Sequence, residues 1–234
     1  MGGLKDKMPR TFWTFVIGGF ALSGFPFFTA GFWSKDEILS DAWMHNQIVF
    51  WVLAVAAFLT AFYTMRQITL TFLGKPRTKE AEHAHETSLW MTGPLMILAF
   101  FALTFGWVGI PEAFPVLGSI SNNWFHGFIG HGVPEWLITE ALEFSWMPLL
   151  VSLTVALGGL GLGYVLYKDV PSAEEDPLKK ALGSVYSVLQ NKYYFDELYD
   201  LIFVRPAKWL SEQFVFLFMD RKVIDGILHA VAQV

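Results

Sequence analysis

Residues Ile48–Phe72 read IVFWVLAVAAFLTAFYTMRQITLTF, an apolar stretch with one formally charged side chain, Arg66. A helix needs roughly 20 mostly apolar residues to cross the hydrocarbon core of a bilayer, and this stretch is long enough. Comparable length is reached by Thr11 to about Ser40, which Pro26 interrupts, and by Leu89–Ile110 and Trp146–Tyr167. Because backbone groups cannot stay unpaired in lipid, all these stretches are predicted to be helical. The sequence therefore predicts an all-α transmembrane helix bundle of about four spans, the first broken near Pro26.

The composition agrees with a membrane setting. Of the 234 residues, 54% are hydrophobic, 17% aromatic and only 16% charged, and the mean hydropathy is +0.43. These values are too apolar for an ordinary soluble domain. The sequence contains no cysteine, which excludes disulfides and Cys-ligated iron–sulfur clusters, so any redox centre is expected in another chain. A net charge of −5 without a basic patch excludes nucleic acid as a partner.

Basic residues flank the predicted spans in a consistent pattern. They are Lys5, Lys7 and Arg10 before the first span, Lys75, Arg77 and Lys79 after the second, and Lys168, Lys179 and Lys180 after the fourth. Because Lys and Arg near span ends are retained on the cytoplasmic side, the amino terminus is predicted to be cytoplasmic. The loop Pro111–Ser145 then lies outside, and Glu135–Leu142 within it is predicted to be an interfacial helix.

Three parts are predicted along the chain. Residues 1–168 form the bundle, residues 169–183 a polar connector, and residues 184–234 an amphipathic segment. In the last part, apolar residues recur at helical spacing and charged residues interrupt them. This part is predicted to be a lateral helix lying along the membrane or along neighbouring subunits.

Lys35, followed directly by Asp36 and Glu37, lies in the otherwise apolar first stretch. An ionisable side chain at membrane depth is costly, so it usually faces a polar cavity and marks an ion pathway. Pro26 frees a backbone carbonyl one turn earlier, and broken helices in transporters line hydrated cavities. Lys35 is therefore a candidate proton relay, with Asp36 as its charge partner. The triplet also fits an ordinary helix end whose lysine snorkels to the outer headgroups.

Arg66 is the second charge inside a predicted span. Snorkelling to the inner interface explains it as well as an ion pair does, so it is predicted to be structural, with tuning of a relay as the alternative. His83 and His85 lie close together in a loop. No third well-spaced ligand accompanies them, so no metal site is predicted.

Several motifs resemble a known family. They are ALSGFP at Ala21–Pro26, AGFWSKDEIL at Ala30–Leu39, FYTMR at Phe62–Arg66, YFDELYD at Tyr194–Asp200 and FVRP at Phe203–Pro206. These stretches resemble the large antiporter-like subunit of respiratory complex I, NADH-quinone oxidoreductase, which in bacteria is subunit L. The SKDEIL run after a Pro-broken helix is typical of the antiporter-like superfamily, and the tail motif favours subunit L. The resemblance covers most of the chain.

The resemblance implies a role for the chain and for its partners. Lys35 would be the lysine of the second broken helix, connecting a central hydrophilic axis with the exit side, and Asp36 its neighbour. Quinone reduction elsewhere in the complex would drive proton release outward across a bacterial inner membrane. NAD, FMN, iron–sulfur clusters and quinone would belong to other subunits, with no cofactor in this chain. The tail would run along neighbouring antiporter-like subunits on the cytoplasmic side.

The sequence also departs from the family. The larger amino-terminal part of such a subunit, with its first broken helix, and the last spanning helix have no counterpart here. The chain is therefore interpreted as a fragment that does not pump alone. Two other hypotheses stay open: the large subunit of a multisubunit sodium/proton antiporter or of a hydrogenase-type membrane complex, and a structural remnant without transport of its own.

Overall fold

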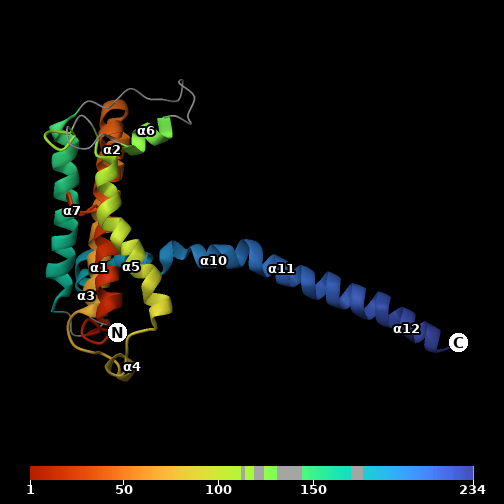
Figure 1. Ribbon diagram of the computed structural model, residues 1–234. Helices are drawn as coiled ribbons and strands as arrows, with labels where there is room; N and C mark the ends of the chain where they lie inside the picture. The colour runs from red at the N-terminus through yellow and green to blue at the C-terminus, as the bar shows by residue number, and fades with distance from the viewer. Residues whose placement is uncertain (112–113, 119–123, 131–143, 170–175, 234) are drawn as a thin grey trace. The chain divides into compact units, whose positions relative to one another are not determined.

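The computed structural model describes residues 1–111, 114–118, 124–130, 144–169 and 176–233 (Figure 1). Every regular element in these residues is a helix. The elements are α1 (Pro9–Ser23), α2 (Ala30–His45), α3 (Gln47–Phe72), α4 (Lys79–Glu82), α5 (Leu89–Thr104), η1 (Phe105–Gly109), α6 (Trp124–Gly130), α7 (Trp146–Tyr167), α8 (Pro177–Leu182), α9 (Ser184–Gln190), η3 (Lys192–Tyr194), α10 (Phe195–Tyr199), η4 (Asp200–Val204), α11 (Arg205–Leu210), η5 (Ser211–Ile224) and α12 (Asp225–Ala232). They form two compact units, Met1–Asp176 and Pro177–Val234.

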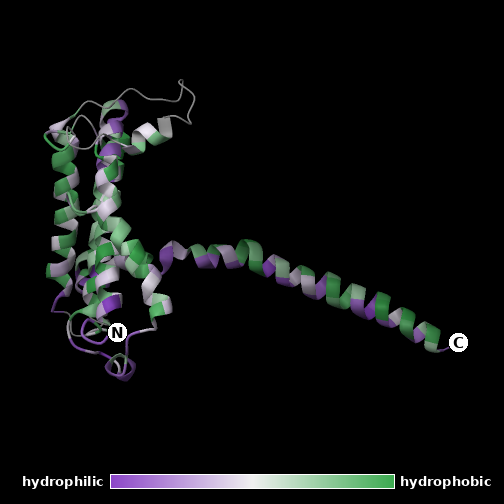
Figure 2. Ribbon diagram, in the orientation of Figure 1, coloured by the Kyte–Doolittle hydropathy of each residue, from purple (hydrophilic) through white to green (hydrophobic). Residues whose placement is uncertain are grey.

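The first unit is the predicted helix bundle. In the described residues, three helical stretches are long and apolar enough to cross a membrane: Gln47–Phe72, Leu89–Gly109 and Trp146–Tyr167. The first predicted span consists of two shorter helices, α1 and α2, separated by residues 24–29. The all-α bundle with a first span broken near Pro26 is therefore confirmed. Figure 2 shows hydrophobic residues along the long helices and hydrophilic residues gathered near the amino terminus and α4.

Helix α1 ends in a Schellman motif centred on Gly24. Gly24 has φ +74°, a left-handed conformation that only glycine adopts without strain. The Gly24 N–H donates to the Ala21 carbonyl at 3.1 Å, and the Phe25 N–H donates to the Phe20 carbonyl at 2.9 Å. The rings of Phe20 and Phe25 stack with centroids 4.9 Å apart, which is the apolar contact that commonly accompanies this motif. The chain therefore leaves the helix at Gly24, two residues before Pro26.

Helices α3 and α7 form the most extensive contact in the bundle. Small residues of α7 permit it, because a Cβ at Gly159 would lie 2.6 Å from the Phe58 carbonyl oxygen, and one at Gly163 would lie 2.8 Å from that of Phe62. Small residues four apart on one helix let two backbones approach closely in membrane helix pairs. Asn46 caps the start of α3, since its Oδ1 accepts hydrogen bonds from the N–H groups of residues 48 and 49 at 3.0 and 3.2 Å.

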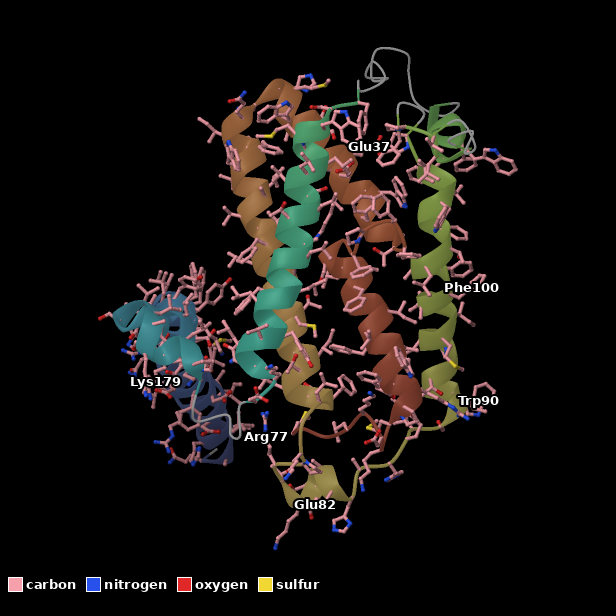
Figure 3. The ribbon with its side chains drawn as sticks, turned by 90° about the vertical axis from the view of Figure 1, so that its left-hand side faces the viewer. Glu37, Arg77, Glu82, Trp90, Phe100 and Lys179 are labelled. Atoms are coloured by element: carbon pink, nitrogen blue, oxygen red, sulfur yellow. The ribbon has the colours of Figure 1, made fainter. Side chains whose placement is uncertain are left out.

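The amino terminus and the loop after α3 lie at the same end of the bundle (Figure 1). The N–H groups of Gly2 and Gly3 donate to carbonyls at residues 71 and 73. Glu86, which precedes α5, caps α1 from a distance: its carboxylate accepts from the Arg10 N–H at 2.7 Å and from the Thr11 hydroxyl at 2.7 Å. Figure 3 places Arg77 and Glu82 at this end of the bundle and Glu37 near the opposite end.

The second unit contains the helical elements α8 to α12, with turns at Gly183 and Asn191 and left-handed φ values at residues 192–194. Residues 177–182 form α8, although the sequence analysis assigned them to the polar connector. Within the unit, ion pairs link neighbouring turns: Lys192 Nζ lies 2.6 Å from Asp196, and Arg205 Nε lies 2.8 Å from Asp200. A lateral course along other subunits stays a prediction. The predicted interfacial helix at 135–142 and most of the predicted connector lie outside the described residues.

Candidate functional site

Lys35 binds the carbonyl that the helix break leaves free. The Schellman motif at the end of α1 pairs the carbonyls of Phe20 and Ala21 but not that of Leu22. The Lys35 Nζ donates to the Leu22 oxygen at 2.7 Å, so the ammonium group sits at the negative, carboxyl-terminal end of α1. The side chain is half-buried. This geometry gives Lys35 a partner within the bundle, which a lysine snorkelling to the headgroups does not need.

The contact depends on a close approach of α1 and α2. A Cβ at Gly31 would lie 1.8 Å from the Ala21 carbonyl oxygen, so only glycine fits at this position. Lys35 follows Gly31 by one turn of α2, and Leu22 follows Ala21 in α1. The close approach at Gly31 therefore brings Lys35 within reach of the free carbonyl.

Asp36 contacts a different helix, α7. Its Oδ1 accepts a hydrogen bond from the Ser152 hydroxyl of α7 at 2.8 Å. Both side chains are buried, with 8% of Asp36 and 5% of Ser152 exposed. Successive residues of an α-helix point about 100° apart, which explains why Lys35 and Asp36 have separate partners. The ion pairs found among the described residues do not include one between Lys35 and Asp36.

A small cavity is lined by Lys35 and Ser152, but not by Asp36. Its volume is about 10 Å³, close to the room that one water molecule needs, and its polar lining comes from Ser23, Lys35 and Ser152. The Ser23 hydroxyl donates to the Gly19 carbonyl at 2.8 Å, which leaves its oxygen lone pairs available. The exposed carboxylate of Glu37 lies elsewhere, on a larger apolar crevice of about 570 Å³ between α2, η1 and α6.

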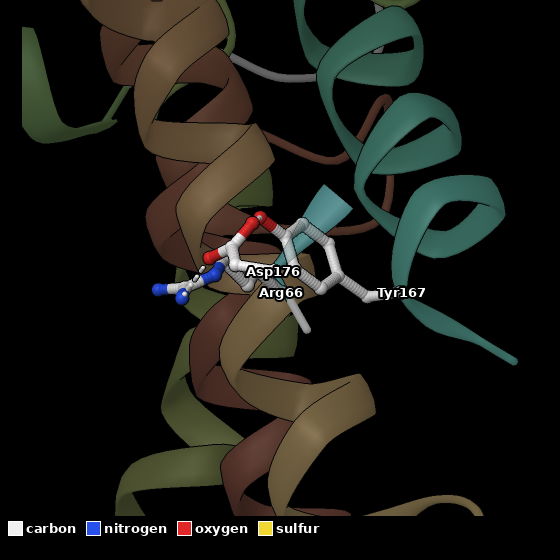
Figure 4. A network of polar contacts seen from close by, with 3 residues as sticks. All are labelled: Arg66, Tyr167 and Asp176. Atoms are coloured by element: carbon white, nitrogen blue, oxygen red, sulfur yellow. Dashed lines mark hydrogen bonds and ion pairs between the residues drawn. The ribbon is translucent and has the colours of Figure 1, made fainter. Parts of the chain in front are cut away.

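Arg66 belongs to a separate polar cluster (Figure 4). Its Nη2 donates to Asp176 Oδ2 at 2.8 Å, and the Tyr167 hydroxyl donates to Asp176 Oδ1 at 2.9 Å. The guanidinium carbon also lies 5.1 Å from the centre of the Tyr167 ring. The Asp176 side chain is 6% exposed and that of Arg66 42%. Of the two explanations for Arg66 that the sequence left open, the geometry favours the ion pair.

Three of the groups in these contacts are not predicted from the sequence: Ser152, Asp176 and the free carbonyl of Leu22. Ser152 is a polar residue in an apolar span and Asp176 ends an acidic run, so both carry a weak signal. Neither signal predicts which residue is contacted, because Ser152 and Asp36 are 116 positions apart in the sequence and Asp176 and Arg66 are 110 positions apart. His83 and His85 lie just after α4, and the described residues contain no cluster of three or more His, Cys, Asp or Glu with metal-binding geometry.

Fold and site together define the chain as a helical membrane protein with a broken first span, a half-buried Lys35 and a buried Asp36. Residues 1–60 match the family model described as NADH:quinone oxidoreductase/Mrp antiporter, transmembrane. Over 96% of its length the chain is 35% identical to NADH-quinone oxidoreductase subunit L of Rickettsia felis, covering 36% of that protein. It is 33% identical over 98% of its length to NAD(P)H-quinone oxidoreductase chain 5 of a Synechocystis species, covering 38% of it. The chain is thus similar to these proteins over nearly its whole length, and it spans little more than a third of theirs.

Proposed function

We propose that this chain is part of a membrane subunit of a proton-pumping NADH:quinone oxidoreductase and that Lys35 acts in it as a proton relay. Asp36 is the neighbouring acid that shares the proton. The chain itself takes no electrons, and NADH oxidation and quinone reduction occur in other subunits. The observation that carries the proposal is the hydrogen bond from Lys35 to the carbonyl freed at the break of the first span.

The chemistry of the two side chains suits a relay. Lysine can lose its proton and become a neutral amine when it is desolvated, whereas arginine stays charged. Leu22 offers Lys35 an acceptor that holds the ammonium form in place, and the neutral amine keeps two N–H groups that can donate to the same oxygen more weakly. Asp36 is bonded to a neutral hydroxyl rather than to a cation, so both its ionised and its protonated form can keep a partner.

We infer the direction of transport from the basic residues at one end of the bundle. The amino terminus lies at the same end of the bundle as α4 (Figure 1), and Figure 3 shows Arg77 and Glu82 at that end and Glu37 near the other. With the basic end in the cytoplasm, Lys35 lies on the outward half of the broken span, and the proton leaves on the outer side. We place the subunit in the bacterial inner membrane, beside other antiporter-like subunits that the amphipathic tail contacts.

The test uses the complete complex reconstituted in vesicles, with NADH oxidation and acidification measured together. Lys35→Ala abolishes most pumping, because the relay group is removed. Lys35→Arg keeps the charge but cannot release a proton, so it pumps no better than Lys35→Ala. Lys168→Ala, at the end of α7 and away from the cavity, is the matched control and pumps normally. Normal pumping by Lys35→Ala would refute the assignment, and normal pumping by Lys35→Arg alone would reduce Lys35 to a fixed charge.

The alternative function is that of a sodium/proton antiporter subunit, because the matching family description also names the Mrp antiporter. The two functions differ in the ion that the vesicles exchange. Acidification driven by NADH without sodium supports the oxidoreductase, whereas acidification that requires a sodium gradient supports the antiporter.

A further inference from the structure

We propose that Ser152 of α7 is the positioning residue through which Lys35 and Asp36 exchange a proton, by way of one water molecule in the cavity between α1, α2, α3 and α7. The inference rests on the proposed function, because it assumes that Lys35 is a relay. It adds to that function a path for the proton between Lys35 and Asp36, which are adjacent in the sequence but have separate hydrogen-bond partners.

The geometry of α2 explains why a proton needs a path between Lys35 and Asp36. Lys35 reaches α1 at the Leu22 carbonyl, while Asp36 reaches α7 at Ser152. Among the described residues, Ser152 is the side chain that both donates to Asp36 and lines the cavity shared with Lys35. In this proposal the water accepts a hydrogen bond from the Lys35 ammonium and donates to the hydroxyl oxygens of Ser152 and Ser23, since all three residues line the cavity and a buried water needs two to four polar partners.

The Ser152 hydroxyl has two acceptors for one hydrogen. Its Oγ lies 2.8 Å from Asp36 Oδ1 and 3.0 Å from the Leu149 carbonyl oxygen. When Asp36 is ionised, the hydroxyl donates to it. When Asp36 is protonated, the hydroxyl turns to Leu149 and its lone pair accepts the hydrogen bond from the acid. Ser152 therefore keeps Asp36 in place in both protonation states.

The transfer is balanced at every atom. The Lys35 ammonium gives a proton to the water, the water gives one of its own to Ser152 Oγ, and Ser152 gives its original hydroxyl proton to Asp36 Oδ1. The products are a neutral amine, an intact water, an intact hydroxyl and a carboxylic acid, with no charge left on the water or the serine. The reverse sequence restores the starting state, so Asp36 can load and discharge while its contact with α7 persists.

The experiment compares Ser152→Ala, Ser152→Cys and Ser152→Thr with Thr154→Ala in the complete complex in vesicles. Thr154 is the matched control, because it is an exposed α7 residue whose hydroxyl donates to the Leu150 carbonyl at 2.7 Å. In Ser152→Ala and in the nearly isosteric Ser152→Cys the pumping rate falls about ten-fold, the factor that corresponds to a lost hydrogen bond of about 1.4 kcal/mol. Ser152→Thr, which keeps the hydroxyl, and Thr154→Ala pump as the unmodified complex does.

A spectroscopic readout separates this role from packing. The infrared carbonyl band of protonated Asp36, identified by its loss in Asp36→Asn, moves in Ser152→Ala and Ser152→Cys and returns to its place in Ser152→Thr. If Ser152→Ala does not assemble, Ser152→Cys decides the matter. This inference is wrong if Ser152→Cys leaves both the pumping rate and the infrared band unchanged. If Lys35→Ala still abolishes pumping in that case, the proposed function is retained. Full pumping by Lys35→Ala overturns the proposed function itself.

Discussion

Removal of the Asp176 carboxylate tests whether Arg66 is held by an ion pair or simply reaches the membrane surface. Asp176→Ala deletes two contacts, the one from Arg66 Nη2 at 2.8 Å and the one from the Tyr167 hydroxyl at 2.9 Å. Tyr167 is 1% exposed, so its hydroxyl loses an ionised acceptor without gaining water, which costs about 1.5–3 kcal/mol. Arg66 is 42% exposed, so solvent limits its share to at most about 1 kcal/mol. Unfolding should therefore become easier by about 2–4 kcal/mol.

A double-mutant cycle separates the two contacts. The free energy of unfolding is measured by reversible denaturation in mixed micelles for Arg66→Ala, Asp176→Ala, Tyr167→Phe and the two double variants that include Asp176→Ala. We expect a coupling of about 0.5–1 kcal/mol between Arg66 and Asp176 and a larger one between Tyr167 and Asp176. Additivity of Arg66→Ala and Asp176→Ala within about 0.3 kcal/mol would refute the ion pair and restore the snorkelling explanation.

The same variants test whether Arg66 affects proton transfer through the proposed Lys35 relay. Arg66 is not among the residues that line the cavity beside Lys35 and Ser152. Assembled complexes with Arg66→Ala should therefore pump as many protons per NADH as the unmodified complex, even though they are less stable. A fall in that ratio would favour the tuning role.

Three further predictions concern packing and capping. Gly159→Ala should cost about 1–3 kcal/mol of unfolding free energy, because its Cβ would meet the backbone of α3 at 2.6 Å, whereas Gly161→Ala, with open space around it, should cost nothing. Asn46→Ala should cost about 1 kcal/mol through loss of the α3 cap, measured in the same assay. Partial burial acts to raise the pKa of Glu86, but hydrogen bonds from Thr11 and from backbone N–H groups lower it below its ordinary value. Glu86 therefore stabilises the fold above its unfolded-state pKa, and this contribution, absent in Glu86→Gln, is lost as the pH falls below about 4.5 toward the folded-state pKa.

The sequence was sufficient to predict the bundle because lipid imposes strong rules. Unpaired backbone groups are not tolerated in hydrocarbon, so length and apolar content alone identify the spans. The break in the first span was also predictable, since Pro26 removes a backbone donor. The sequence did not reveal that the chain leaves the helix at Gly24, or that a Schellman motif decides which carbonyl stays free for Lys35.

The partners across the bundle were not predictable from the sequence. A helix places Lys35 and Asp36 on different faces, but which helix each face meets depends on the rotation and register of α1 and α7. Those are fixed by close approaches at Gly31 and along α7, and the pattern of apolar residues does not show them. For the same reason, the sequence does not distinguish Ser152 from the other residues of its apolar span.

Different residues of α7 contribute to the stability of the bundle and to the proposed proton transfer. Its Gly159 and Gly163 pack on α3, Tyr167 closes the cluster at one end of the helix, and Ser152 reaches α2 near the other end. The close packing of α7 on α3 at these glycines stabilises the bundle in every protonation state, because these contacts do not titrate. The bond between Ser152 and Asp36, in contrast, must change its donor when Asp36 gains a proton. Variants in the glycine positions should therefore lower stability while the pumping of each assembled complex is retained, whereas Ser152→Cys should lower the pumping of complexes that do assemble.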